Sequence, residues 1–495
     1  MKSRPTVALK LIPHLILIQI ALGISSCPQD LGGGVCPDNS KCCKIHSATG
    51  QTTSGCLPHN NHLKGPGTCC HDTAFFGGGT ACPGNYQCGY SVKSGTNSTI
   101  CFLPDSQGNV IEEMPRYNIA EAVPREIGDY YGFPISSSDE KAVLAYYSNM
   151  GPILTSKQTL DSKIEVAVIV THGSGRNADE YLYSMMTAAK MQSCYKNVLV
   201  IAPRFLAVED GVFAVPVITD DDMIMISPMK WNETYPIPHT WRYGANALSP
   251  SNEFSSYDAM DAIVEQLISN SGKDGRFQNL KRVVVAGHSA GGQFTHRWSL
   301  TSNSPIWGDS IIDRNDEVKD SRMLKHGRGG VEIVVVVANP RSFAYLDGRR
   351  FMNSSHYQTP PEELRNSCPT YNSWEWGLDA GGLDAPYKDK ALAFFEGDIF
   401  KLAARYSKRN VVYLAGGNDT EPLHGSCEDD WFQGATRLIR SQRFLESMER
   451  IFGKRVHSRL VVKNVGHDHG LIFQSEEARS VMFGNTENGS SNTSL

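Results

Sequence analysis

Short apolar runs rich in β-branched residues recur along the later two-thirds of the chain. They lie at 164–170, 198–202, 283–286, 333–338, 411–415 and 460–462. Segments with the apolar spacing of a helix, such as 256–268, fall between them. Strands that are apolar at nearly every position and alternate with helices are typical of a mostly parallel sheet covered on both faces. The pattern predicts an α/β domain whose working residues lie in loops past the carboxyl ends of the strands.

The start of the chain has the pattern of a secretory signal peptide. Basic residues precede the apolar run 11–24, and small residues follow it, so we expect 1–26 to be removed during export. An N-terminal membrane anchor is the alternative. Pro13 and His14 interrupt the run and leave it shorter than the roughly 20 residues that a spanning helix needs. The expected location is therefore extracellular or the lumen of the secretory and endolysosomal pathway.

Cysteine is concentrated in the segment that follows. Of 13 cysteines, ten precede residue 102: Cys27, Cys36, Cys42, Cys43, Cys56, Cys69, Cys70, Cys82, Cys88 and Cys101. A dense, even set behind a signal peptide predicts a disulfide-rich module at 27–104. A zinc module is the competing interpretation, but its closely spaced cysteine pairs are missing. Glycosylation sequons agree with export, at Asn97, Asn232, Asn353, Asn488 and Asn492.

This cysteine-rich module repeats itself. A Gly-Gly-Gly stretch before Cys36-Pro is echoed by one before Cys82-Pro. With the double cysteines at 42–43 and 69–70, the module resembles granulin or another small secreted domain held by disulfides. The connectivity stays open, and a polymer or a protein is the kind of ligand that we consider for it.

Composition limits the remaining choices. The chain has 495 residues, 40% of them hydrophobic and 20% charged, as in ordinary globular proteins. A net charge of −5 gives no general attraction to nucleic acid, so we expect no such partner. We expect a linker at 105–138, the α/β domain at 139–484 and a polar tail at 485–495, with no integral membrane segment after cleavage.

The motif G-x-S-x-G follows one of the predicted buried strands. It comprises Gly287, Ser289 and Gly291, with a helix-compatible run behind it. A sharp turn from strand to helix exposes the serine oxygen and brings it near a base and backbone N–H groups. The alternative is a Gly/Ser turn that merely ends a strand. Because the apolar run 282–286 stands directly in front, we interpret Ser289 as a nucleophile.

Two further strand ends supply an acid and a base in the order that this kind of site requires. Asp419 follows the run 411–415, and His467 follows 460–462. His467 would take the Ser289 proton while Asp419 orients the ring. An isolated Asp or His after a strand is more often a cap or a turn residue. His469 is the rival base in the same loop, and we interpret Asp468 as a solvated or capping carboxylate.

An oxyanion hole needs one N–H from the residue after the nucleophile and another from the loop after an early strand. Ala290 is the first, and Ser174, in the loop that begins at His172, is the expected second. His172 as a metal ligand is the competing interpretation, but no second ligand stands four residues away. We expect no metal and no organic cofactor.

Several stretches together resemble secreted α/β-hydrolases. They are His172-Gly-Ser-Gly-Arg-Asn-Ala178, Ser255-Ser-Tyr-Asp-Ala-Met-Asp261, Gly287-His-Ser-Ala-Gly-Gly-Gln293, Ala338-Asn-Pro340 with Tyr345-Leu-Asp347, and Gly466-His-Asp468. The group is similar to extracellular esterases and, more distantly, to feruloyl esterases and polyester depolymerases. The resemblance implies an α/β-hydrolase fold over 140–484, ester hydrolysis and a disulfide between Cys368 and Cys427. Asn464, which precedes Val465, and Arg341 depart from the common pattern, where a glycine and a small residue stand.

The function is therefore predicted to be hydrolysis of carboxylic esters, on small or polymeric substrates. A serine peptidase of the same fold is one alternative, although no propeller repeat accompanies the domain. A binding protein on an inactive scaffold is the other. Cys194 would be a buried free thiol, or would join the N-terminal module. Trp374 and Trp376 are candidates for the cleft, and the insertions 209–246 and 302–330 for a lid.

Overall fold

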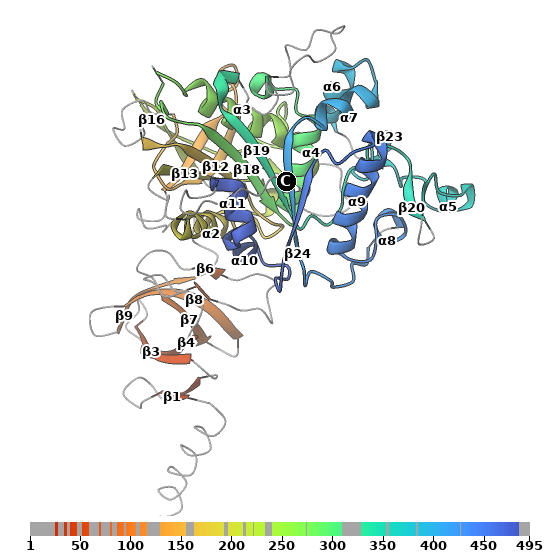
Figure 1. Ribbon diagram of the computed structural model, residues 1–495. Coiled ribbons are helices and arrows are strands. Elements are labelled where there is room, and N and C mark those ends of the chain that lie inside the picture. The colour runs from red at the N-terminus through yellow and green to blue at the C-terminus, as the bar shows by residue number, and fades with distance from the viewer. Residues whose placement is uncertain are drawn as a thin grey trace, which may run out of the picture. The chain divides into compact units, whose positions relative to one another are not determined.

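The computed structural model divides the chain into two units, 1–128 and 129–495 (Figure 1). In the first unit only short strands between residues 25 and 115 are described, as backbone. In the second, the description covers 129–484 except for 155–162, 193–196, 211–213, 221, 233–239, 274, 309–327, 353–355, 383–384 and 426, with the side chains of 129, 380–382, 429 and 430 also left out. The expected signal peptide up to residue 24, Cys194, Asn353 and the tail 485–495 lie outside the described residues.

The N-terminal unit contains a closed barrel of five strands: β3 (Ser40–His46), β4 (Thr52–Pro58), β7 (Gln87–Lys93), β8 (Thr96–Pro104) and β9 (Asn109–Pro115). Two short pairs accompany it, β1 (Ser25–Cys27) with β2 (Gly34–Cys36), and β5 (Cys69–Cys70) with β6 (Thr80–Ala81). In the pairing of β3 with β4, Cys42 is opposite Cys56, and in the pairing of β7 with β8, Cys88 is opposite Cys101. These are equivalent positions in the two copies of the sequence repeat, so each copy forms the same antiparallel hairpin.

Strand structure extends into the range that we expected to be a linker. β9 lies beyond residue 104, and β10 (Asp129–Pro134) is the first strand of the second unit, where it pairs with β11 (Val143–Ser148). β10 is hard to predict from the sequence, because glycine and proline interrupt its apolar pattern and tyrosines dominate the rest. Tyr131 and Phe133 are nevertheless buried, and they anchor this strand on the core.

The second unit is built on an eight-stranded sheet in the order β10-β11-β13-β12-β18-β19-β24-β25. Its remaining strands are β12 (Val166–Thr171), β13 (Val198–Arg204), β18 (Arg282–His288), β19 (Glu332–Ala338), β24 (Asn410–Gly416) and β25 (Ser458–Val462). Only β11, among these strands, runs against the others. The predicted α/β class is confirmed, and the strand order is that of an α/β-hydrolase fold.

Helices cover both faces of this sheet, as the uniformly apolar strands require. On one face, alternate residues of the central strands such as Val285 and Val337 share a core with Met260, Phe294 and Phe444. Those three side chains come from α3 (Ser256–Ser269), α4 (Ala290–Thr301) and α9 (Arg437–Phe452). Three other helices pack together against the same sheet: α2 (Ala178–Met191), α10 (His469–Gln474) and α11 (Glu476–Phe483) (Figure 1).

Smaller elements fill the connections of the second unit. They are β14 (Leu206–Ala207), η5 (Val208–Asp210), β15 (Val215–Ile218), β16 (Met223–Ile226), β17 (Lys230–Trp231), η6 (Trp241–Tyr243), η7 (Pro305–Trp307), η9 (Arg328–Gly330), β20 (Arg350–Met352), β21 (His356–Gln358), α5 (Glu362–Ser367), β22 (Ser373–Trp374), β23 (Asp379–Gly382), α6 (Pro386–Phe394), α7 (Ile399–Tyr406) and α8 (Cys427–Phe432). Within the described residues no helix is long and apolar enough to cross a membrane.

The two tryptophans considered for the cleft are buried. Trp374 has no exposed surface, and its indole Nε1–H donates to the carbonyl of Tyr243 over 2.9 Å. Trp376 is 8% exposed. Trp374 is therefore a core residue that fastens β22 to η6. The lid expected from 302–330 falls largely on residues outside the description, and the hairpin β15–β16 in the other insertion is exposed at Met223 and Met225.

Candidate active site

Ser289 stands at a sharp turn between the last residue of β18 and the first residue of α4. Its φ of 59° and ψ of −116° are strained for a residue with a side chain. The backbone N–H of Ser289 donates to the carbonyl of Ala338 at the end of β19, over 3.0 Å. This bond to the neighbouring strand end helps to hold the strained turn in place.

The glycines on either side of Ser289 are required by close backbone contacts. A Cβ on Gly287 would lie 2.2 Å from the carbonyl oxygen of Gly291, where the chain folds back on itself. A Cβ on Gly291 would lie 2.2 Å from the carbonyl oxygen of Thr171, at the end of β12. Both positions must therefore lack a side chain, as the motif predicts for a nucleophile turn.

The structure brings together the three side chains that the sequence predicts as nucleophile, base and acid. His467 Nε2 lies 2.9 Å from Ser289 Oγ, and His467 Nδ1 lies 2.7 Å from Asp419 Oδ2. Because a carboxylate can only accept, Nδ1 carries the hydrogen and Nε2 is free to accept from the serine hydroxyl. The Asp419 side chain is 1% exposed and that of His467 is 29% exposed, so solvent reaches the base but not the acid.

Asp419 is held by its own loop and by one cation. Its backbone N–H donates to Gly416 O at the end of β24, and its carbonyl accepts from the N–H of Leu438. Arg437 Nη1 lies 3.4 Å from Asp419 Oδ1, the oxygen that His467 does not use. The neighbouring Asn418 donates its N–H to Val465 O over 2.8 Å. The backbone of Val465, which follows Asn464 where the common pattern has a glycine, therefore links the acid loop to the loop of His467.

The rival base turns away from the serine. His469 Nδ1 lies 3.0 Å from Ser184 Oγ, and its ring stacks on Tyr181 with centroids 4.0 Å apart. Both partners belong to α2. Asp468 caps α10, because its side chain accepts from the N–H of Leu471 over 2.8 Å. Geometry thus favours His467 over His469, and Asp468 has the capping role that the sequence suggested.

The two expected oxyanion donors lie in segments close to Ser289 in the structure. Ala290 begins α4, so its N–H has no acceptor inside the helix. Ser174 is exposed in the loop after β12, and a Cβ on its neighbour Gly173 would lie 3.8 Å from Ser289 Cβ. Both expected donors are therefore carried by segments that pass beside the serine, and their role in an oxyanion hole stays a prediction.

An ion pair fixes the loop that carries Ser174. Arg176, at a φ of 53°, donates from Nε and Nη2 to the two carboxylate oxygens of Asp210, over 2.7 and 3.0 Å. Burial alone would raise the pKa of Asp210, but hydrogen bonds from Arg176 and from the Ala207 N–H lower it below the ordinary value. Asp210 therefore stays charged and keeps the loop anchored to η5.

His172 has a structural role rather than the role of a metal ligand. Its Nε2 accepts from the backbone N–H of Phe205 over 2.9 Å, and its Nδ1–H donates to Gly173 O over 2.8 Å. Burial lowers its pKa to about 3, so the ring is neutral. The lone pair that a metal would need is already engaged, and the ring instead shapes the start of the loop that carries Ser174.

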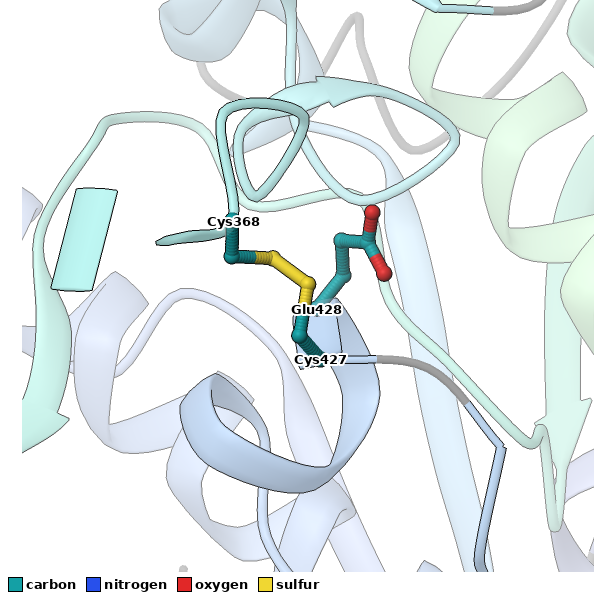
Figure 2. A group of neighbouring side chains, drawn as sticks. All are labelled: Cys368, Cys427 and Glu428. Atoms are coloured by element: carbon teal, nitrogen blue, oxygen red, sulfur yellow. A yellow bond between two sulfur atoms is a disulfide. The ribbon is translucent and has the colours of Figure 1, made fainter. Parts of the chain in front are cut away.

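One group of potential metal ligands occurs among the residues that the structure describes: Cys368, Cys427 and Glu428. Figure 2 shows the two sulfur atoms bonded to each other, with the carboxylate beside them. The Cα atoms of the two cysteines are 6.0 Å apart, and the Glu428 carboxylate accepts from the hydroxyl of Thr370. This cluster is a cross-link between the end of α5 and the start of α8.

Arg341 braces the segment between Asp419 and this disulfide. Its Nη2 donates to His424 O over 3.0 Å, and its carbonyl accepts from Arg440 Nη1 over 2.8 Å. A Cβ on Gly425 would lie 2.2 Å from Arg341 Nη2, so the guanidinium packs directly on that backbone. The residue that departs from the common pattern therefore supports the acid loop.

Three buried residues beside the site were missed in the sequence. They are Tyr181, His288 and Asn339, which are 3%, 2% and 2% exposed. Tyr181 Oη lies 3.2 Å from His288 Nδ1, and Asn339 Nδ2 lies 3.3 Å from His288 Nε2. His288 and Asn339 each belong to one of the motifs that resemble α/β-hydrolases, but no spacing in the sequence indicates that they are in contact. Tyr181 has the sequence context of an ordinary helix residue.

Three of the solved structures that match this chain are named as a depolymerase or as hydrolases. A poly(3-hydroxybutyrate) depolymerase, LpqC, from Bordetella parapertussis is 17% identical, covering 75% of this chain and 94% of its own, with a TM-score of 0.42. Poly(aspartic acid) hydrolase-1 from Sphingomonas sp. KT-1 is 16% identical, covering 72% of this chain and 98% of its own, with a TM-score of 0.42. The siderophore hydrolase EstB from Aspergillus nidulans is 12% identical, covering 74% of this chain and 99% of its own, with a TM-score of 0.34. No protein-family model and no curated protein sequence matches the chain.

Proposed function

We propose that this chain is a serine hydrolase that cleaves carboxylic esters through an acyl-enzyme on Ser289. The observation that carries the proposal is the position of His467, 2.9 Å from Ser289 Oγ and 2.7 Å from Asp419 Oδ2. A serine, a histidine and an aspartate joined in this way make a weakly nucleophilic hydroxyl an effective nucleophile, because the imidazole can accept the hydroxyl proton during attack.

In the first half of the reaction, Ser289 Oγ attacks the ester carbonyl carbon while its proton moves to His467 Nε2. The resulting oxyanion accepts hydrogen bonds from the N–H groups of Ala290 and Ser174. Asp419 stabilises the imidazolium through Nδ1–H. The intermediate then collapses, and the departing alkoxide takes the proton from Nε2 and leaves as the alcohol.

In the second half, a water molecule takes the place of the alcohol. His467 Nε2 accepts a proton from the water as its oxygen attacks the acyl carbonyl carbon. The same two N–H groups stabilise the second oxyanion. Collapse breaks the bond to Ser289 Oγ, which recovers its proton from His467, and the carboxylic acid is released. The water-exposed side of His467 gives this step access to solvent.

Ester substrates are favoured over peptides by the motifs. Those around His172, Ser289, Asn339 and His467 resemble the motifs of secreted esterases. A peptidase of the same fold usually carries a propeller or comparable lid, and no propeller repeat is found in the sequence. Small and polymeric esters both fit this proposal. The serine peptidase and the binding protein on an inactive scaffold become outcomes of the experiment below.

The test combines active-site labelling with turnover. A fluorophosphonate should label the native chain, and Ser289→Ala should abolish labelling while circular dichroism and thermal unfolding stay unchanged. Ser299→Ala is the matched control, because Ser299 lies on the same helix and its hydroxyl donates to His296 O. p-Nitrophenyl esters of short and long acids should be hydrolysed. Cleavage of a peptide amide alone would make the chain a peptidase, and a native chain with neither labelling nor turnover would favour the binding protein.

We further propose that the chain is exported and that its cysteine-rich unit is held by disulfides. The support is the N-terminal pattern of the sequence and the ten cysteines before residue 102. Expression in a secreting eukaryotic host should release a product that begins near residue 27 and shifts on removal of N-linked glycans. Retention of residues 1–26 in a membrane fraction would contradict export.

A further inference from the structure

A buried series of polar side chains runs beneath Ser289. It begins at Tyr181 on α2, passes through His288 at the end of β18, and ends at Asn339 just past β19. The two contacts join residues that are 107 and 51 positions apart in the chain. Buried polar groups are kept when each is satisfied, so the direction of each hydrogen bond carries information about what this series does.

The amide of Asn339 can be oriented from its backbone partners. Its Oδ1 accepts from the N–H of Gly416 over 2.8 Å, and a backbone N–H can only donate. Its Nδ2 donates to Gly466 O over 3.3 Å, and a carbonyl can only accept. The side of the amide that faces His288 is therefore the NH₂ group.

The orientation of Asn339 fixes the tautomer of His288. Because the amide donates to Nε2, the ring proton sits on Nδ1 and is donated to Tyr181 Oη. Burial lowers the pKa of His288 well below its ordinary value, and the nearby His467 ring adds to the effect. His288 is thus a neutral relay with one donor and one acceptor, and its ring centroid is 4.5 Å from that of His467.

Both ends of the series reach the loops that hold the proposed catalytic groups. At one end, a Cβ on Gly173 would lie 2.8 Å from Tyr181 Oη, so the phenol packs under the residue that precedes Ser174. Burial raises the pKa of Tyr181, and a backbone hydrogen bond from Gly173 acts in the opposite direction. At the other end, Gly466 is the residue before His467, and Gly416 closes β24 ahead of Asp419.

The backbone of Asn339 is also fixed, by its conformation and by a hydrogen bond to β24. Its φ is 43°, in the left-handed region that asparagine adopts more readily than most residues with a side chain. Its N–H donates to Leu414 O on β24 over 3.0 Å. Main chain and side chain together therefore fasten the ends of β19 and β24 to the loop after β25.

We propose that Tyr181, His288 and Asn339 are positioning residues that hold the Ser174 loop and the His467 loop in register about Ser289. The inference rests on the proposed function and deepens it. None of the three touches the reacting atoms. They act by fixing an oxyanion donor and the general base, which must sit within roughly 0.5 Å of their productive places. Loss of such fixation lowers transition-state stabilisation more than substrate binding.

Two conservative variants test the series. Tyr181→Phe removes the acceptor of His288 but keeps the ring that stacks on His469. Asn339→Asp keeps the acceptor for Gly416 but sets a carboxylate oxygen against Gly466 O and His288 Nε2. Each variant should lower kcat for a p-nitrophenyl ester by about 10- to 100-fold, with KM changed less than about threefold. Thermal unfolding should confirm that both variants are folded.

The double variant gives the sharper readout. Because both substitutions alter a hydrogen bond of the same ring, that of His288, the combined loss in kcat should be clearly smaller than the product of the two single losses. His457→Gln is the matched control: this histidine is also buried, its Nε2 contacts Tyr406 O, and its ring neighbours are Tyr406 and Tyr413. It should keep the kcat of the native chain.

The outcomes separate this inference from the proposed function. If the native chain takes no fluorophosphonate label and turns over no ester, the proposed function fails. If the native chain is active but folded Tyr181→Phe keeps its full kcat, the positioning series is wrong and the proposed function stands. Fully multiplicative losses in the double variant would also contradict the series, because independent sites would then be acting. Should Asn339→Asp not fold, the Tyr181→Phe result decides alone.

Discussion

Two carboxylates of the second unit, the buried Asp419 and the partly exposed Asp261, show how hydrogen-bonded carboxylates can have different roles. Asp419, past β24, contacts the imidazole of His467 and the guanidinium of Arg437. Asp261, on α3, accepts only from neutral donors: the Trp298 indole over 2.8 Å, the Ser302 hydroxyl over 2.7 Å and the Tyr387 hydroxyl. Both carboxylates fasten distant segments together.

The difference lies in where each set of polar contacts ends. The contacts of Asp419 continue through His467 to Ser289, a hydroxyl beside solvent-accessible space. The contacts of Asp261 stay among α3, α4 and α6. Burial raises the pKa of Asp261 to about 7, and its three hydrogen bonds partly oppose this increase. A hydrogen-bonded carboxylate supports chemistry when its partner can pass a proton onward. Otherwise it supports packing.

Asp419→Asn should have the largest effect of the variants that test this comparison. The amide would donate to His467 Nδ1 and favour the wrong tautomer, so kcat for ester hydrolysis should fall by roughly 10³- to 10⁴-fold. Steady-state kinetics with p-nitrophenyl esters would measure it, and thermal unfolding should stay near that of the native chain. A loss below about tenfold would remove Asp419 from the proposed machinery.

Asp261→Asn should change the pH dependence of stability and leave ester turnover nearly intact. The folded pKa of about 7 is above the ordinary 3.8, so between these values the native state holds a proton that the unfolded state has released. The free energy of unfolding of the native chain should therefore fall as pH rises towards 7, by on the order of 2 kcal/mol between pH 5 and 8 relative to the variant. Urea unfolding at both pH values measures this, and parallel pH profiles would contradict it.

Arg437→Gln should have the smallest effect. The guanidinium lies 3.4 Å from Asp419 Oδ1, while His467 holds the other oxygen, so its loss removes a weak attraction and not the orienting contact. We expect kcat to fall by about threefold. Arg455→Gln is the matched control, because it breaks an exposed pair with Glu449 and should leave kcat unchanged. A loss as large as that in Asp419→Asn would make Arg437 part of the machinery.

The sequence predicted those parts of the site that follow from local signals. Buried strands could be recognised by their apolar runs, and Ser289, Asp419 and His467 lie in the segments that follow three of them. β10 escaped recognition because glycine and proline break its pattern. The contact between Cys368 and Cys427 was accessible only through resemblance, because spacing alone does not define a partner.

Other features depended on packing that no local pattern encodes. Trp374 could have lined a cleft on composition alone, but its indole satisfies a buried carbonyl. The place of His469, the rival base in the sequence, depended on α2, which presents Ser184 and Tyr181 to it. The series from Tyr181 to Asn339 joins three elements whose proximity exists only in the folded sheet.

The placement of β25 has a consequence for when activity can first arise. This strand pairs only with β24 at the border of the eight-stranded sheet, and it delivers an imidazole that lies 178 residues downstream of the serine it contacts. A nascent polypeptide emerging from the ribosome amino end first would already carry its hydroxyl and then its carboxylate, yet would be inert. Under the proposed mechanism, hydrolysis would begin only once β25 pairs with β24, so a product truncated before this strand would be inactive however well its remainder folded.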